Sequence, residues 1–456
     1  MPISDSLAAA LRDIFPGDAC APDAATRAAY AYDNSRRIAM PDAVVFPTTH
    51  EQVVALVAAC RAAHVPLVAR GRGTNTTGAT VPDAGGVVAS FERMHRILAI
   101  APGDRIAIVE PGVLNADLQR ALAEHGLFWP PDPTSAPYCT IGGNLACNAG
   151  GPRAVKYGAT RDNVLGLRAV AGNGRAFRCG TRTTKGSVGY DLTRFIVGSE
   201  GTLALVTEAT LKLAPKPAAV RTLRAAFRDV ESAADAVARI MAQAVTPCAL
   251  EFMDDAALEL ARAHGGDAPA QAGALLLIEV DGAEDALAAA AAAIESAARV
   301  DGLLEWRVAR DAAETGALWA ARKALSPALR TISPHKINED VVVPVSRVPE
   351  LVGRLRELAD AYALPIVSFG HAGNGNLHVN LLPRDEAERA RAGACLADLF
   401  ALVISLEGTL SGEHGIGMLK REFMPLALEA STLQLMRNVK VAFDPDGILN
   451  PGKLLP

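Results

Sequence analysis

The chain has 456 residues, half of them apolar, which is enough for two or three domains with a substantial core. Its 45 lysines and arginines stand against 50 aspartates and glutamates, giving a formal net charge of -5 without any long basic block. Composition therefore argues against a nucleic-acid partner and for a globular enzyme.

The N-terminal segment MPISDSLAAALRDIF predicts a short amphipathic helix. This segment has an acidic residue near its start and lacks a basic region followed by a long apolar core, so it does not resemble a secretory signal. The most monotonous apolar run, residues 286–294, is far shorter than the roughly 20 residues that a membrane-spanning helix needs. Seven scattered cysteines without a C-x-x-C pair indicate reduced thiols. We expect a cytoplasmic protein without a transmembrane segment, and peripheral membrane association is left open.

A loop rich in glycine and hydroxyl groups follows the next helix and strand. Apolar spacing over residues 51–64 predicts the helix, and VPLVA at 65–69 predicts a buried strand. The loop itself, RGRGTNTTGAT at 70–80, leads into a strand-like segment rather than a helix, so it is not a dinucleotide fingerprint. Its backbone amides can form a nest for a phosphate, and a mobile surface turn is the alternative at this point.

A second glycine-rich region spans residues 130–158. Its prolines fix an extended entry, while the glycine pairs at 142–143 and 150–151 let the backbone approach something flat and large. A long loop without secondary structure is usually functional or disordered, and the apolar content here argues against disorder. We expect this region to form the wall of a cofactor site.

The third such region, residues 185–217, ends in an alternating strand, VTEATLKLAP, that closes a domain. Residues 218–310 then alternate helices such as 229–244 with strands such as 274–282. We expect residues 218–310 to be scaffold without a chemical role.

A helix predicted from the sequence ETGALWAARKALSPAL, residues 314–329, places Trp319, Arg322 and Ser326 on one face. An arginine there would ordinarily be a surface residue above an apolar stem.

Two histidines come together in GHAGNGNLHVN, residues 370–380. The asparagine-glycine pair in its middle is a strong signal for a two-residue hairpin turn. Counting outward from that turn pairs His371 with His378, with Cβ atoms roughly 5 Å apart on one face of the hairpin. Alternation with period two adds Asn380 to the same face. A pair of structural histidines is the alternative to a metal site at this point.

The motif EGTLSGEHGIG, residues 407–417, supplies a carboxylate beside a third histidine. Glu413 together with His371 and His378 makes two imidazoles and one carboxylate, a common metal-site composition with positions left for substrate. His414, adjacent in sequence to Glu413, points in a different direction in any regular structure and can serve as a base.

Six motifs occur in order, namely RGRGTNTTG, PPDPTS with TIGGNLACNAGG, GYDLTRFIVGSEGTL, GHAGNGNLHVN, EGTLSGEHGIG and DPDGILNPGK. Together they resemble the FAD-dependent D-2-hydroxyacid dehydrogenases, which include D-lactate dehydrogenases, D-2-hydroxyglutarate dehydrogenases and the D subunit of glycolate oxidase. That family lies within the flavin superfamily of vanillyl-alcohol oxidase and para-cresol methylhydroxylase. The resemblance extends from about Val44 to Lys453, and its departures, Ala204-Leu205 and Asn374, remove no required functional group.

The resemblance implies an α+β fold in three parts. A two-part FAD-binding domain of the vanillyl-alcohol oxidase type is expected at 1–217, an α+β substrate and metal domain with an antiparallel sheet at 218–435, and a segment returning to the FAD domain at 436–456. FAD is expected to be non-covalent, because the phosphate loop carries no histidine or cysteine. The residues expected to bind FAD are Arg70, Gly71, Arg72, Gly73, Thr74, Asn75, Thr76, Thr77, Pro131, Thr134, Thr140, Gly142, Gly143, Asn144, Asn148, Gly150, Tyr157, Gly158, Glu200, Gly201 and Asn450.

The resemblance also implies the chemistry. Arg322 and Lys336 would bind the substrate carboxylate, since a guanidinium fork and an ammonium suit it well. Ser326 would assist, Asn380 would orient the substrate, and His414 would accept the hydroxyl proton. The α-hydrogen would pass as hydride to the flavin, giving a 2-oxo acid. The expected ligands of a divalent metal, with zinc favoured and manganese or iron as alternatives, are His371, His378 and Glu413.

Three other functions stay open at this point. An electron-transfer flavin subunit of a glycolate-oxidase-type complex is disfavoured by the presence of Arg322 and Lys336. A transferase like alkyl-glycerone-phosphate synthase is disfavoured because no run of histidines occurs. A metal hydrolase without flavin is the third. The sequence fixes neither the 2-hydroxy acid nor the electron acceptor, for which an electron-transfer flavoprotein, a cytochrome and a quinone are candidates, and a homodimer is also open.

Overall fold

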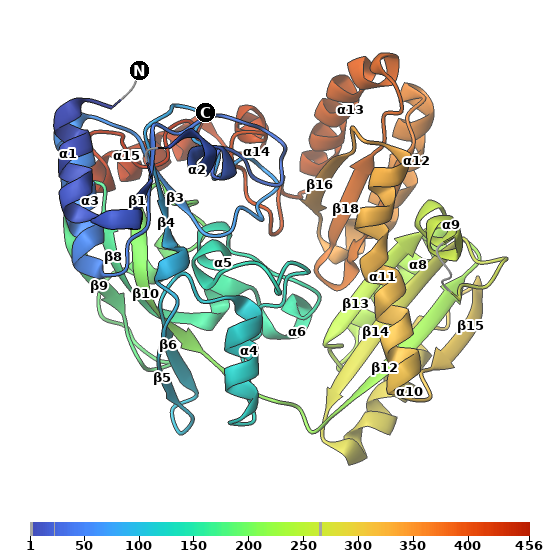
Figure 1. Cartoon of the computed structure of the whole chain (residues 1–456). Helices are drawn as coiled ribbons and strands as arrows, with labels where there is room; N and C mark the ends of the chain where they lie inside the picture. The colour runs from blue at the N-terminus through green and yellow to red at the C-terminus, as the bar shows by residue number, and fades with distance from the viewer. Residues whose placement is uncertain (1–2, 22, 264–266) are drawn as a thin grey trace. The chain divides into compact units, whose positions relative to one another are not determined.

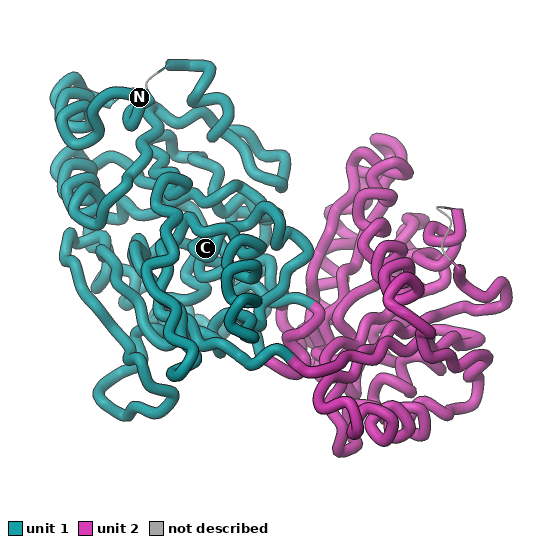
Figure 2. The backbone as a smooth tube through the Cα atoms, turned by 60° about the horizontal axis from the view of Figure 1, so that its bottom comes forward, with its two compact units in different colours: residues 1–151, 158–216, 413–456 teal, residues 152–157, 217–412 magenta. Residues whose placement is uncertain are grey.

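The chain folds into two compact units, which Figure 2 shows in different colours. The structure, a computed structural model, describes residues 3–21, 23–263 and 267–456. Unit 1 comprises residues 1–151, 158–216 and 413–456, and unit 2 comprises residues 152–157 and 217–412. The chain returns to unit 1 at Glu413 rather than at the expected residue 436, because the loop after Gly412 already bonds to other segments of unit 1.

The first sheet of unit 1 has the strand order β1-β2-β4-β3, with β2 and β3 parallel to β4. The predicted helix at the N-terminus is confirmed as α1, which begins at Asp5. Met1 and Pro2 of the predicted segment lie outside the described residues. Helices α1 and α3 lie side by side and bury apolar faces in the core of this sheet (Figure 1). The elements are α1 (Asp5–Ile14), β1 (Cys20–Ala21), α2 (Ala24–Ala29), β2 (Ala43–Val45), α3 (His50–Ala63), β3 (Leu67–Arg70) and β4 (Val87–Ser90).

The second sheet of unit 1 is antiparallel, in the order β5-β6-β10-β8-β9. The expectation that residues 130–158 lack secondary structure is wrong, because two short helices form there. The first of them begins where the Thr140 hydroxyl accepts a hydrogen bond from the Gly143 amide, 3.1 Å away. The elements are β5 (Ile97–Ala101), β6 (Ile106–Val109), α4 (Asn115–Ala123), β7 (Leu127–Phe128), α5 (Ile141–Cys147), α6 (Ala154–Tyr157), β8 (Val164–Ala171), β9 (Ala176–Gly180), α7 (Leu192–Ile196), β10 (Ala204–Lys212) and β11 (Ala214–Pro215).

Unit 2 is built on a seven-stranded antiparallel sheet in the order β15-β12-β14-β13-β17-β18-β16. Helices α8, α10 and α12 pack on the sheet, and α9 packs with α11 over a core that includes Met253, Leu277 and Phe369. The elements are β12 (Ala219–Phe227), α8 (Val230–Ala242), β13 (Ala249–Asp254), α9 (Asp255–Ala263), β14 (Ala274–Gly282), α10 (Leu287–Ala298), β15 (Leu303–Val308), α11 (Ala312–Ile332), β16 (Ile337–Val342), α12 (Val348–Tyr362), β17 (Ile366–His371), β18 (Asn376–Leu381) and α13 (Glu386–Ser405).

The last segment of the chain belongs to unit 1 and contains α14 (Met424–Ala427) and α15 (Ala430–Phe443). Of the helices within the described residues, none combines the length and the apolarity that crossing a membrane requires. All seven cysteines are free thiols.

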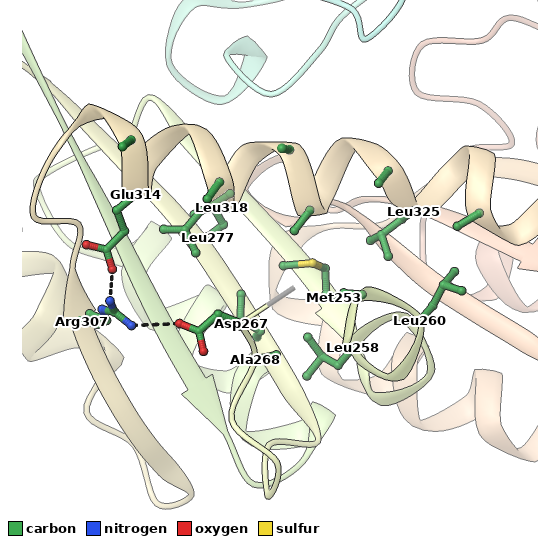
Figure 3. Close-up of a pocket in the computed structure, with 18 of the residues that line it drawn as sticks. Met253, Leu258, Leu260, Asp267, Ala268, Leu277, Arg307, Glu314, Leu318 and Leu325 are labelled. Atoms are coloured by element: carbon green, nitrogen blue, oxygen red, sulfur yellow. Dashed lines mark hydrogen bonds and ion pairs between the residues drawn. The ribbon is translucent and has the colours of Figure 1, made fainter. Parts of the chain in front are cut away.

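A pocket of about 680 Å³ lies in unit 2 between α11, α9 and the sheet (Figure 3). Its interior is apolar, with Leu258, Leu277 and Leu325 among the lining residues. At one end Arg307 forms ion pairs with Asp267 and Glu314, so the charges there are paired with one another. None of the residues expected from the sequence to act on substrate, metal or flavin lines this pocket.

Candidate active site

The predicted pairing of His371 with His378 across the hairpin is wrong. The structure pairs His371 with Asn376 and Phe369 with His378. A two-residue turn of the expected type needs positive φ at both central residues. Only Gly375 has one, at 71°, and residues 372–374 form a short 3-10 turn instead, so the loop is longer and the register shifts.

The two imidazoles nevertheless share one face of the sheet. The shift moves the pairing by two residues, and a displacement of two preserves the face because strand side chains alternate with period two. His371 and His378 are therefore diagonal neighbours, with ring centroids 5.2 Å apart. Asn380, opposite Val367, lies on the same face. The prediction that all three side chains share a face is confirmed.

A buried glutamate on the neighbouring strand binds one of the histidines. β13 pairs with β17 so that Phe252 lies opposite Gly370, which sets Glu251 beside His371. The Glu251 Oε1 atom lies 2.5 Å from His371 Nδ1, and its Oε2 atom lies 2.7 Å from an Arg322 guanidinium nitrogen. Glu251 is 1% exposed. The expectation that residues 218–310 are scaffold alone is therefore wrong at this residue.

Electrostatics keep Glu251 ionised despite its burial. Burial by itself raises the pKa of a carboxyl, but the positive charges of His371 in its protonated form and of Arg322 outweigh that effect and lower the pKa of Glu251 to about 2. An ionised carboxylate only accepts hydrogen bonds, so His371 donates from Nδ1. In the neutral ring, which is the form that binds a metal, Nε2 is then the nitrogen with the lone pair.

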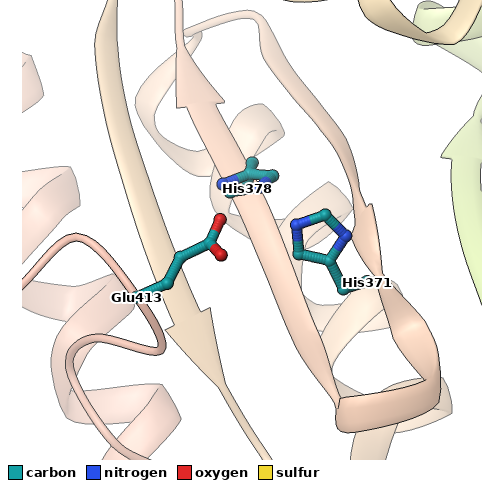
Figure 4. Close-up of side chains that lie close together, drawn as sticks. All are labelled: His371, His378 and Glu413. Atoms are coloured by element: carbon teal, nitrogen blue, oxygen red, sulfur yellow. The ribbon is translucent and has the colours of Figure 1, made fainter. Parts of the chain in front are cut away.

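Glu413 completes the expected metal set. Its predecessor Gly412 donates its amide to the Asp340 carboxylate over 2.9 Å, and Asp340 lies on β16 directly opposite His378. One ligand atom from each of His371, His378 and Glu413 lies within 4.8 Å of the others. Figure 4 shows the Glu413 carboxylate and the two imidazole rings pointing into one space. Two imidazoles and one carboxylate fit a divalent cation such as zinc.

The residues expected to hold a substrate carboxylate lie on and beside α11. Arg322 is buried, and its guanidinium carbon lies 4.6 Å from the ring centroid of Phe369. Ser326, one helical turn later, accepts a 3.0 Å hydrogen bond from the Lys336 ammonium. Asn380 donates to the carbonyls of Val367 and His378, while its buried Oδ1 has no hydrogen-bond partner within the described chain.

In unit 1 the predicted phosphate loop is organised by one side chain. Asn75 accepts 2.8 Å hydrogen bonds from the amide and the hydroxyl of Thr77 and donates to the His414 carbonyl over 2.9 Å. The neighbouring Thr76 hydroxyl is buried and has no partner among the described residues. A buried hydroxyl without a protein partner, in a loop after a strand, fits contact with a phosphate oxygen of the expected FAD.

Several distant segments meet at this loop. The Glu200 carboxylate accepts the amides of Ile416 and Gly417 over 2.6 and 2.8 Å. The Asn450 side chain donates to the carbonyls of Glu200 and Ala79 over 2.7 and 2.8 Å. Burial raises the pKa of Glu200 to about 7, although these amides and the two nearby lysines, Lys420 and Lys453, oppose that effect. The structure thus brings residues expected at the flavin site together with the loop that carries His414.

Other expected FAD residues lie elsewhere. Asn144 is buried, where it accepts a hydrogen bond from Asn115. Asn148 ends α5 and accepts the Arg161 amide, while Thr134 is exposed. Tyr157 belongs to unit 2, where its hydroxyl donates to Asp281 over 2.6 Å.

Sequence reasoning missed Glu251 and Asp340. Each is a carboxylate on a strand of the central sheet, ALEFMD and INEDVV respectively, and both side chains are buried, at 1% and 0% exposure. A buried acid needs a partner, so an acidic residue in a core strand was the available signal. The identity of the partner was not available, because Glu251 and His371 are 120 residues apart in sequence.

Two family models match the chain. The FAD binding domain matches residues 41–180, and the C-terminal domain of FAD linked oxidases matches residues 216–454. The chain is 40% identical to the glycolate oxidase subunit GlcD of Bacillus subtilis, with 94% of this chain and 92% of that protein covered. It is 35% identical to D-2-hydroxyglutarate dehydrogenase of Stutzerimonas stutzeri, with 95% of each chain covered. A solved structure of p-cresol methylhydroxylase matches with a TM-score of 0.82 at 17% identity over 99% of this chain and 98% of that one, and it shows the two-domain fold.

Proposed function

Because the chain belongs to the FAD-linked oxidoreductases of the group that includes D-lactate dehydrogenase, D-2-hydroxyglutarate dehydrogenase and GlcD, we propose that it oxidises a D-2-hydroxy acid to the 2-oxo acid. The observation that carries this proposal is that a candidate carboxylate-binding site and a candidate metal site lie on the same face of the sheet. The buried Arg322 is tied through Glu251 to His371 of the histidine and carboxylate group. A 2-hydroxy acid presents a carboxylate and a hydroxyl on adjacent carbons, and the two sites match those two groups.

The residues divide into two sets by the part of the substrate that they address. Arg322 and Lys336 bind the carboxylate, with Ser326 keeping the Lys336 ammonium in place through the hydrogen bond described above. Asn380 presents its unpartnered Oδ1 to the substrate. His414 accepts the proton of the α-hydroxyl, a contribution typically worth 10²–10⁴-fold in rate.

Two groups supply chemistry that no side chain in the chain can provide. His371, His378 and Glu413 would hold a divalent metal, with zinc favoured, which would supply Lewis-acid polarisation of the hydroxyl oxygen. FAD, held by the loops of unit 1 without a covalent link, would supply the acceptor for the α-hydrogen and its electron pair. The C–H and O–H bonds break, the proton goes to His414, and the carbonyl forms. Such a flavin would need a further electron acceptor, for which an electron-transfer flavoprotein, a cytochrome and a quinone are the candidates.

The proposal is tested by reducing the purified yellow protein without oxygen. D- and L-2-hydroxy acids, including lactate, glycolate, malate and 2-hydroxyglutarate, are added one at a time while the visible absorbance of the flavin is recorded. We expect bleaching by one or more D acids and not by their L enantiomers. A chelator should prevent the bleaching, and added zinc, manganese or ferrous ion should restore it. Flavin that no 2-hydroxy acid reduces, but that dithionite does, would contradict the proposal and favour an electron-transfer subunit.

A glycine substitution tests the position of the flavin site in unit 1. Gly417 has a left-handed backbone with φ of 54°, and a methyl group on it would collide with the Thr77 carbonyl oxygen. Gly417→Ala is expected to displace the loop that Glu200 and Asn75 hold and to lower FAD affinity by about tenfold or more, since left-handed backbone alone costs roughly 1–2 kcal/mol. The loss of FAD affinity is measured as the ratio of bound flavin to protein after dialysis.

The matched control is Gly103→Ala, at an exposed turn of the same unit where a methyl group would meet nothing within 4 Å. It should retain full flavin content. Equal flavin retention by both variants would place the cofactor away from this loop.

A further inference from the structure

We propose that Glu251 is a positioning residue that holds the metal ligand His371 and the carboxylate-binding Arg322 with the two oxygens of one side chain. This inference rests on the proposed function, because it assigns a shared support to the metal site and to the substrate-binding arginine. The role is separate from contact with substrate, since Glu251 is buried at 1% exposure behind the two residues that it holds.

The backbone fixes Glu251 in this position. It lies on β13, a central strand of the sheet, where it pairs with Leu277 of β14, and the next residue, Phe252, pairs with Gly370 of β17. Cross-strand neighbours share a face, which directs the carboxylate toward His371. α11 packs over that same face and brings Arg322 to the other oxygen.

Toward His371, the carboxylate selects one tautomer of the imidazole. Nδ1 lies 2.5 Å from Glu251 Oε1 and must donate to it, which leaves Nε2 as the ligand atom. The same contact fixes the rotation of the ring. A histidine that donates its other nitrogen to a carboxylate is a better metal ligand, and removal of such a carboxylate typically lowers metal affinity 10–100-fold.

Toward Arg322, the carboxylate limits the positions that the guanidinium can take. One face of the guanidinium lies over Phe369, and a terminal nitrogen lies 2.7 Å from Glu251 Oε2. The remaining Nε atom is buried without a hydrogen-bond partner in the described chain. Glu251 therefore occupies one side of the Arg322 guanidinium and fixes the position of the guanidinium relative to His371.

Two substitutions at Glu251 separate this role from simple stabilisation of the core. In Glu251→Gln the amide oxygen still accepts from His371 Nδ1, but the amide nitrogen is a second donor facing the Arg322 guanidinium. In Glu251→Ala both contacts are lost. A positioning role therefore predicts that the glutamine variant keeps the metal and loses substrate affinity, whereas the alanine variant loses both.

The experiment uses the full-length holoprotein. Zinc affinity is measured by competition with a chromophoric chelator, and KM and kcat are measured with the D acid that bleaches the flavin best. For Glu251→Gln we expect zinc affinity within about tenfold of the native protein and KM raised about 10–100-fold, the range for losing a buried contact with a charged group. For Glu251→Ala we expect zinc affinity to fall about 10–100-fold as well.

The matched control is Glu279→Gln on the adjacent strand β14. Glu279 is also a buried glutamate, but its carboxylate accepts hydrogen bonds from Trp319 and Thr222, whereas that of Glu251 contacts His371 and Arg322. Its variant should keep native zinc affinity and KM, and its thermal unfolding shows the cost of neutralising a buried carboxylate in this sheet.

The outcomes distinguish this inference from the proposed function. Native zinc affinity and KM in both Glu251 variants would overturn the inference while the proposed function stands. Equal changes in the Glu251→Gln and Glu279→Gln variants would show a structural role and overturn it as well. If the native protein binds no zinc, manganese or iron, the metal part of the proposed function fails, and an unchanged KM in Glu251→Gln would then overturn the inference independently.

Discussion

Replacing His378 with alanine is expected to abolish stoichiometric metal binding and to lower kcat by about 10³-fold or more, because Lewis-acid stabilisation is worth several kcal/mol. The flavin should stay bound, since His378 lies in unit 2 and the expected FAD loops lie in unit 1. His378 is chosen over His371 because its removal leaves the contact between Glu251 and His371 in place. Metal analysis of the dialysed protein, its visible spectrum and steady-state kinetics are the measurements.

The control for this substitution is His125→Ala, which removes an exposed histidine of unit 1. It should match the native protein in metal content and in kcat. Loss of flavin colour in the His378 variant would contradict the expectation that FAD binds without the help of His378. Full turnover by a metal-free His378 variant would remove the metal from the proposed reaction.

Replacing His414 with alanine is expected to lower kcat by about 10²–10⁴-fold, the usual contribution of a general base. Metal and flavin content should not change. The backbone at this residue is anchored independently of the imidazole. The His414 carbonyl accepts a 2.9 Å hydrogen bond from the side-chain amide of Asn75, and the backbone amides of Ile416 and Gly417 donate to the Glu200 carboxylate. The substitution therefore removes the imidazole with little effect on the loop.

Chemical rescue distinguishes a base from a residue that merely packs. Imidazole added to the solution should restore part of the kcat lost in the His414→Ala variant, because a free imidazole can accept the hydroxyl proton in its place. A variant whose lowered kcat is not restored by added imidazole would assign the base to another residue.

Local patterns predicted the elements of unit 2 well. The strand expected at residues 274–282 is β14 with the same bounds, and the helix expected at 229–244 is α8, Val230–Ala242. Apolar periodicity predicts both elements, and α8 is also stabilised by a cap, in which the Asp229 side chain accepts a hydrogen bond from the Ser232 amide. The α+β class and the two-domain FAD-binding fold, expected from the motifs, are confirmed by the family matches and by the fold comparison.

Turn geometry was less predictable. Asn374-Gly375 is a frequent pair in two-residue turns, but β16 and the chain after it constrain this hairpin from outside. Gly375 contacts Val343 so closely that no side chain fits there, and its amide hydrogen-bonds to the Ala372 carbonyl over 2.9 Å. The tertiary contact therefore favours a longer loop, and the register moves by two residues.

The sequence by itself determined that His371, His378 and Asn380 share a face of the hairpin. Alternation along a strand is a local property, and a register shift of two residues does not change the face on which a side chain lies. It also determined the residue types of the candidate site: two imidazoles, a carboxylate, a guanidinium and an adjacent base. Only the tertiary structure decided which buried carboxylate supports them. Glu251 meets His371 and Arg322 through pairing of strands and packing of a helix far apart in the chain, and no local pattern encodes such contacts.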